Sequence, residues 1–209
     1  MKLNFKKSIV IYKNQISKKE KKEIMFLIRK ENKKSILSQL SENVLFNYLN
    51  LVVKSKFLIL FSLKFKNKIV AYALVARKPS YLISEISSLK FLILLDLFAR
   101  LKILTIINLF LTFSKIDNLF IDKNFIKLKE KSLNLNLLAV KENFQSNGVG
   151  KYFLKYIFNK LKVSKKNNIT CETFSRRATK FYQNKFAFKV MGKKIRFFKT
   201  LTVLSLQET

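Results

Sequence analysis

The sequence predicts an α/β fold built around one mixed sheet. Its 209 residues, of which 49% are hydrophobic, are enough for one sizeable core. Some segments repeat apolar residues at helical spacing, whereas others alternate or are rich in β-branched residues. In the second half, strands and helices follow one another in turn. We therefore expect one domain, residues 1–209, with a helical hydrophobic insertion at about 80–131.

The first half of the chain predicts two helices and then a β-hairpin. Ser41 is a candidate N-cap for the second helix. The hairpin is expected to turn at Lys66–Lys68, between two runs of β-branched and aromatic residues. The elements are expected over residues 18–34, 41–53, 57–65 and 69–77.

The insertion contains an apolar run that is interrupted by Asp96, Arg100 and Lys102. Its longest uncharged part has 12 residues, whereas a membrane-spanning helix needs about 20. We expect one or two amphipathic helices, with Leu89/Ile93 and Leu97/Leu101 paired on one face. Two interpretations stay open: ordinary core helices, or a surface at residues 89–113 that docks on a membrane or a partner.

The second half predicts a regular alternation that ends in a hairpin. The strand at 132–140 alternates and then becomes fully apolar, as a strand entering a core does. We expect Gly192 to lie at the turn of the last hairpin. The remaining elements are a helix, a strand, a helix and this hairpin, over residues 148–162, 169–174, 176–186 and 187–206.

Composition excludes several chemistries. There is no histidine, so Ser-His-Asp, Cys-His and histidine-based zinc sites are ruled out. A single cysteine, Cys171, forms neither an internal disulfide nor a cysteine-rich metal site, so we expect no metal. The apolar stretch near the N-terminus is too short for a secretory signal. We expect a cytoplasmic protein, with contact to the inner face of the membrane left open.

The net charge of +31 has two interpretations. It favours binding to polyanions such as nucleic acid. It also fits an A+T-rich coding sequence that fills surface positions with lysine, and lysine greatly outnumbers arginine here. We favour the second interpretation, so nucleic acid is not the expected partner. Anionic small ligands are attracted in either case.

Two of the three glycines lie in one short loop between a strand and a helix, in the sequence Gln145-Ser146-Asn147-Gly148-Val149-Gly150. Glycines at such a turn let the backbone come close to a ligand. The amides and the positive end of the helix dipole then face an anion. The spacing matches neither GxxxxGK[ST] nor GxGxxG. A tight turn without a ligand is the alternative.

The loop and a downstream segment together resemble the GCN5-related N-acetyltransferases, the GNAT family. The motif Q-x-x-G-x-G follows a strand that ends in Ala139-Val140. Downstream, Ser175 to Tyr182, followed by Ala187-Phe188, resembles the family's pattern N-x-x-A-x-x-F-Y-x-x-x-G-F. The resemblance is good over about residues 132–200, weaker but consistent in element order over 1–77, and absent over 80–131. It implies the GNAT fold, a mixed, mostly antiparallel, twisted sheet flanked by helices.

The resemblance implies acetyl-CoA as cosubstrate and assigns roles to individual residues. Tyr182 stands where the family often has a general acid, a role that suits a phenol of pKa about 10. Ser175 stands at a position that contacts the cofactor. The main chain of one strand would pair with the pantetheine arm, and loop amides would hold the pyrophosphate. The strand residues are Leu138, Ala139 and Val140, and the loop residues are Gln145, Ser146, Asn147, Gly148, Val149 and Gly150.

The sequence departs from the family pattern at several positions. Ser175 replaces Asn, Ala187 replaces Gly, and one extra residue follows Tyr182. Asn134 stands where many members have a catalytic Glu, so no general base is identified. The candidates acting through water are Glu85, Glu130 and Glu172.

The expected function is acetyl transfer from acetyl-CoA to a primary amine. The hydrophobic, basic insertion resembles members that modify amino sugars of surface-polysaccharide pathways, which favours such an acceptor. The alternatives are a protein N-terminal or lysine acetyltransferase, and a non-catalytic module that binds CoA or RNA. The sequence does not determine the oligomeric state.

Overall fold

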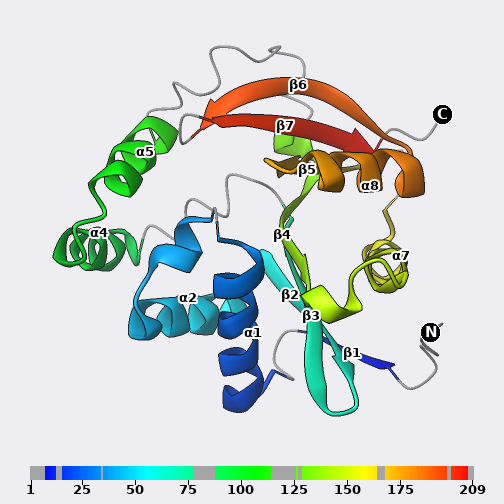
Figure 1. The fold of residues 1–209 in the computed structure, drawn as a ribbon, viewed down its shortest axis with the longest axis horizontal. Helices are drawn as coiled ribbons and strands as arrows, with labels where there is room; N and C mark the ends of the chain where they lie inside the picture. Colours follow the sequence, from blue (N-terminus) through cyan, green and yellow to red (C-terminus); the bar gives the residue numbers. More distant parts are fainter. Residues whose placement is uncertain are drawn as a thin grey trace.

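The protein is a seven-stranded, twisted sheet with helices on both faces (Figure 1). In this computed structural model the described residues are 8–12, 16–33, 35–77, 88–113, 126, 129–163, 168–196 and 199–206. The strand order is β1-β2-β3-β4-β5-β7-β6. Every neighbouring pair is antiparallel except β4 and β5, which run parallel. The predicted mixed, mostly antiparallel sheet is therefore confirmed.

The helices and strands follow the predicted order, with one additional strand at the start. Their bounds are β1 Ser8–Tyr12, α1 Lys18–Glu31, the short 3-10 helix η3 Ile36–Gln39, α2 Glu42–Lys54, β2 Leu58–Phe65, β3 Lys68–Ala76, α4 Lys90–Ala99, α5 Ile103–Phe113, β4 Leu133–Val140, the 3-10 turn η5 Glu142–Phe144, α7 Val149–Leu161, β5 Ile169–Thr173, α8 Arg176–Phe186, β6 Phe188–Arg196 and β7 Lys199–Leu206.

Serine side chains cap the starts of α1, α2 and α8, as the sequence predicted for α2. The Ser41 hydroxyl accepts a hydrogen bond from the Val44 amide. Ser17 and Glu20 form a capping box at the start of α1. Glu20 is buried, which by itself raises the pKa of its carboxyl, but the contacts with Lys64 and Ser17 hold that pKa below its usual value.

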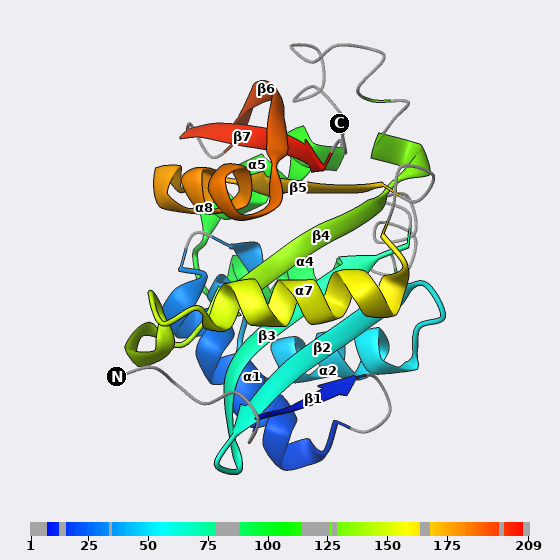
Figure 2. The same ribbon diagram turned by 90° about the vertical axis from the view of Figure 1, so that its right-hand side faces the viewer.

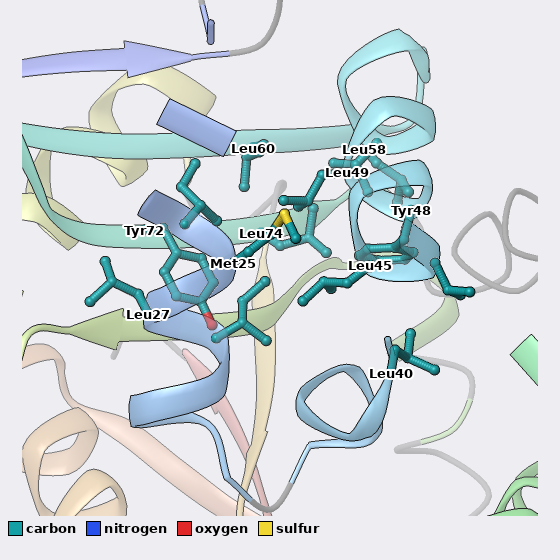
Figure 3. Close-up of a cluster of buried hydrophobic side chains, with 14 of the residues drawn as sticks. Met25, Leu27, Leu40, Leu45, Tyr48, Leu49, Leu58, Leu60, Tyr72 and Leu74 are labelled. Carbon is teal, nitrogen blue, oxygen red and sulfur yellow. The ribbon is translucent and has the colours of Figure 1, made fainter. Parts of the chain in front are cut away.

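The sheet separates two apolar cores. One core packs α1, α2 and the insertion helices against one face, and includes Met25, Tyr48 and Tyr72 (Figure 3). The other core lies under α7 and α8 and includes Phe153, Cys171 and Tyr182. Burial of side chains on both faces explains why β2 and β3 are continuous hydrophobic runs and do not alternate.

Over the described residues 88–113 the insertion forms two helices, α4 and α5, which contact each other and reach the first core through Ile93, Leu97 and Ile106. The predicted pairing of Leu97 with Leu101 is wrong, because Leu101 has a positive φ of 53° and ends the helical run. Its side chain is 81% exposed. Residues 78–87 and 114–125 lie outside the described part of the chain. None of the described helices is long and apolar enough to cross a membrane.

Two local expectations differ from the structure. The strand Ser8–Tyr12 pairs with β2 but was not predicted. Gly192 does not lie at a turn; it lies inside β6, where the register with β7 shifts between Val190 and Gly192. The predicted turn position is therefore wrong, and the glycine adjoins a β-bulge.

Ala187 caps the C-terminal end of α8 with a left-handed backbone, φ 54°. A Cβ is unfavourable in this conformation, by about 1–2 kcal/mol. We therefore expect Ala187→Gly to raise the free energy of unfolding by about 1 kcal/mol. Thermal unfolding should show a midpoint about 2–4 °C higher. Ala178→Gly, inside the same helix, should shift the midpoint in the opposite direction. A lower midpoint for Ala187→Gly would contradict the prediction.

Candidate functional site

Strands β4 and β5 start side by side and then diverge (Figure 2). In the described residues their ladder holds three pairs, which end at Leu135 and Cys171. Strand β4 continues to Val140, so its last residues have an unpaired edge on the β5 side. The resemblance implied that the main chain of this part of β4 pairs with a pantetheine arm, and this edge is where such pairing would take place.

The ladder with β3 determines which main-chain groups of β4 face that edge. The Lys141 amide donates to the Val70 oxygen at 2.8 Å. Main-chain groups alternate in an antiparallel pair, so those of Ala139 also face β3. The N–H and C=O groups of Leu138 and Val140 therefore face the unpaired edge. Of the three predicted strand residues, Leu138 and Val140 present their main chain to that edge and Ala139 does not.

A β-bulge at Asn136 sets this arrangement. Leu74 pairs with Leu137 and Val75 pairs with Leu135, which leaves Asn136 as the extra residue. The bulge shifts the alternation of side chains by one position. Leu135 and Leu138 consequently both pack in the core under α7 and α8.

The glycine loop joins β4 to α7 at the open end of the strand pair. Ser146 and Gly148 have positive φ values of 64° and 80°. The first main-chain bond of α7 runs from the Tyr152 amide to the Gly148 oxygen, 3.0 Å. Among the described residues, the main-chain amides of residues 146–151 donate to no protein acceptor. Gly148, at the N-cap, has no side chain that could bind them. These amides and the positive end of the helix dipole form an anion-binding turn.

The two loop positions, 148 and 150, require glycine for different reasons. Gly148 has open space around the position of a Cβ, so its positive φ is what requires glycine. Gly150 lacks a positive φ, but a Cβ there would lie 3.3 Å from the ring of Phe181 and 3.6 Å from Val140. Gly150 therefore allows the first turn of α7 to pack closely on α8 and β4.

Glu31, which was not predicted as a site residue, holds the loop in place through hydrogen bonds. The Glu31 carboxylate at the end of α1 accepts from the Glu142 amide and from the Gln145 side chain, both at 3.1 Å. The Gln145 side chain also donates to the Val140 oxygen at 2.8 Å. The main-chain amide of Gln145 donates to the main-chain oxygen of Glu142, so this amide is not available to a ligand. Gln145 thus orders the loop through its side chain.

The start of α8 contacts the same loop. Ser175 caps the helix, since its hydroxyl accepts from the Ala178 amide at 3.2 Å. The same first turn contains Arg177, whose guanidinium donates to the Ser146 hydroxyl at 2.9 Å. This arginine was not predicted as a site residue. It adds a fixed positive charge to a loop that already presents amides.

Tyr182 lies in the core beside the point where β4 and β5 diverge. It is 6% exposed, and the rings of Phe181 and Phe188 pack against it with centroids 5.4 Å and 5.2 Å away. Burial raises the pKa of its hydroxyl well above the usual value, and the neighbouring Cys171 thiol raises it further. Cys171 belongs to the last pair of the β4–β5 ladder. The Tyr182 hydroxyl therefore stays protonated across the neutral range.

The three candidate general bases, Glu172, Glu130 and Glu85, differ in their surroundings. Oε1 of Glu172 lies 2.8 Å from the Lys194 ammonium and 2.5 Å from that of Lys129. One oxygen of this carboxylate is thus held between two ammonium groups. Glu130 is exposed at the surface, and Glu85 lies outside the described residues.

Asn134 has a structural role in the described part of β4. Its amide group donates to the Thr170 hydroxyl at 3.0 Å, and both residues are buried. This bond joins β4 to β5 below the point where they diverge. Over the described ranges, no group of three or more metal-binding side chains is found.

Several solved structures that share this fold are acetyltransferases. One is the polyamine N-acetyltransferase of Drosophila melanogaster, with a TM-score of 0.60 and 10% identity over 96% of this chain and 100% of that chain. A second is the ribosomal-protein-S18-alanine N-acetyltransferase of Escherichia coli, with a TM-score of 0.52 and 10% identity over 95% and 92%. A third is a GNAT-family acetyltransferase of Streptococcus pneumoniae, with a TM-score of 0.51 and 12% identity over 95% and 97%.

At these identities the similarity concerns the fold, and the fold that the sequence predicted is confirmed. No protein-family model and no curated protein matches the sequence.

Proposed function

We propose that this chain, which has the GNAT acetyltransferase fold, transfers the acetyl group of acetyl-CoA to a primary amine. The observation that carries the proposal is the conjunction of an unpaired β4 edge with an anion-binding turn at its end. An extended pantetheine arm would pair with the main chain of Leu138 and Val140. The pyrophosphate would accept from the amides between Ser146 and Gly150.

The chemistry would need few side chains. The amine nitrogen attacks the thioester carbonyl carbon, the C–N bond forms, and the C–S bond breaks as the sulfur leaves with its electron pair. The Val140 amide, which faces the unpaired edge, would donate to the developing oxyanion. The Tyr182 hydroxyl would donate to the leaving sulfur. The nitrogen releases its proton to solvent, because no described carboxylate is placed as an unpaired base.

An amino sugar is the acceptor class that we favour. The net charge of +31 attracts anionic ligands such as sugar nucleotides and repels polyamines and lysine-rich peptides. The acceptor preference should therefore differ from that of the polyamine enzyme whose fold is similar.

The test is in two stages. Calorimetric titration with acetyl-CoA measures cofactor binding, and absence of binding at millimolar cofactor would overturn the proposal. Release of the CoA thiol is then followed with nucleotide-linked amino sugars, polyamines and peptides as acceptors. Sugar turnover supports the amino-sugar assignment. Turnover of peptides alone would make the protein a protein acetyltransferase, and cofactor binding without any turnover would make it a non-catalytic module.

Arg177 gives a further test of the cofactor position. We expect Arg177→Gln to weaken acetyl-CoA binding about tenfold, because it removes a charge-assisted contact worth about 1.5–3 kcal/mol beside the pyrophosphate turn. The affinity of the variant should also depend less on salt. Arg29, whose guanidinium donates to the Leu40 oxygen beneath α1, offers a matched control as Arg29→Gln. Equal losses in both variants would show that general charge is responsible.

A further inference from the structure

The exposed faces of α4 and α5 form a large apolar surface, here called the α4–α5 face. Nine of the twelve large hydrophobic side chains found exposed among the described residues belong to it. Soluble proteins rarely leave so many neighbouring apolar side chains in water. The members are Phe91, Leu92, Leu95, Phe98, Leu101, Ile103, Leu104, Ile107 and Phe110. In Figure 1 the two helices lie at the left edge of the molecule, with α5 near the ends of β6 and β7.

This face belongs to helices that are docked firmly on the body of the protein. The Asp96 carboxylate accepts from the Ser41 amide at 2.8 Å, at the start of α2. The Arg100 guanidinium donates to the Gln39 oxygen at 3.0 Å. Ile93 and Leu97 are buried in the core. One side of these helices is therefore packed on the body of the protein, and the apolar side chains of the α4–α5 face are not part of that packing.

The charges around the α4–α5 face are positive. Lys90, Arg100 and Lys102 lie in or between the two helices. Asp96 is the acidic residue among described positions 88–113, and its carboxylate is turned to the body. A hollow of about 590 Å³ next to the start of α4 is lined by Leu89, Lys54 and Lys56, among others. The surroundings of the face thus suit an anionic occupant.

We propose that the α4–α5 face binds to the surface of an anionic lipid bilayer, with its apolar side chains in the acyl boundary and its lysines at the headgroups. Exposed Phe and Leu beside lysine and arginine are typical of helices that lie in a membrane interface. Each basic residue near such a surface adds attraction to anionic lipid. A second copy is a poorer occupant, because two chains that each carry +31 repel one another.

The experiment is flotation of the full chain with phosphatidylcholine vesicles, with and without about 30% phosphatidylglycerol. We expect binding to the anionic vesicles at low salt and little binding to the neutral ones. The variant Phe98→Gln/Leu101→Asn/Ile103→Gln removes three apolar side chains at the turn between the helices. Asn is chosen at Leu101 because it tolerates a positive φ. The variant should bind at least about tenfold more weakly.

A matched control replaces three exposed apolar side chains elsewhere, as Phe26→Gln/Tyr156→Gln/Val190→Gln. It should bind anionic vesicles like the wild type, and circular dichroism should show both variants folded. Absence of vesicle binding at low salt would overturn the proposal. Equal binding by both variants would overturn it too, since net charge alone would then explain the attraction. Sedimentation that shows a dimer, lost only in the first variant and without vesicle binding, would assign the face to a second copy. None of these results depends on acetyl transfer.

Discussion

Replacing Gly148 by valine is expected to weaken acetyl-CoA binding about a hundredfold. Gly148 has a φ of 80° immediately before α7, and a β-branched residue is a rare outlier in that region. The loop would have to leave this conformation, and the amides of the first helical turn would turn away from the pyrophosphate. Loss of two charge-assisted hydrogen bonds accounts for about 3 kcal/mol, which corresponds to the expected factor. Isothermal titration calorimetry measures the change in Kd.

Gly192 supplies the matched control. Its Cβ position is open and its φ lies outside the positive range, so Gly192→Val should leave the affinity unchanged. Gly150→Val should weaken binding by a different cause, since its side chain would press on Phe181 and Val140. Circular dichroism shows whether each variant is folded. If folded Gly148→Val binds acetyl-CoA within about twofold of wild type, the loop does not hold the pyrophosphate.

Features that depend on neighbouring residues in the chain were predicted well. Ser41 and Ser175 cap their helices, since the residues that a cap contacts are only three positions away. The hairpin turn at Lys66 and Asn67 has two positive φ values, as a tight turn between twisted strands requires. The extra residue after Tyr182 is absorbed in α8, which continues to Phe186 before its cap.

Features that depend on distant residues were missed. Strand β1 exists because it pairs with β2, some fifty positions further along. The bulge beside Gly192 depends on the register between β6 and β7, which no local pattern encodes. Glu31 acts on Gln145, 114 residues away. A carboxylate at the end of α1 carries no local signal for that contact. The sequence therefore identified the loop but not the glutamate that holds it in place.

The sequence also found the apolar insertion without deciding between its two interpretations. Periodicity placed Ile93 and Leu97 on a buried face, and that part is confirmed. It gave no measure of how much of the remaining apolar surface the rest of the chain covers. Phe91 and Leu104, which are 73% and 65% exposed, show that much of it stays in water. Core contact and a large exposed apolar surface thus coexist on the same two helices.

Tyr182→Phe is expected to lower kcat about a hundredfold while the Kd for acetyl-CoA stays unchanged. Burial raises the pKa of the Tyr182 hydroxyl well above its usual value, so it remains a hydrogen-bond donor through the neutral and mildly alkaline range. Its pKa lies above that of a free thiol, about 8.5, so it would share a proton with the leaving sulfur and would not ionise beforehand. We therefore expect that kcat of the wild type shows no basic limb below pH about 10.

The ionisation of Tyr182 also links catalysis to stability. Because its folded pKa is raised, its contribution to the free energy of unfolding is complete below pH about 10 and is lost as the pH rises further. Tyr182→Phe should therefore reduce the decrease in the free energy of unfolding at alkaline pH. Tyr48→Phe tests the same linkage in the other core, because burial raises the pKa of Tyr48 as well. Only Tyr182→Phe should also lower kcat. Unchanged kcat in folded Tyr182→Phe would make Tyr182 a core residue, and the leaving thiolate would then take its proton from solvent.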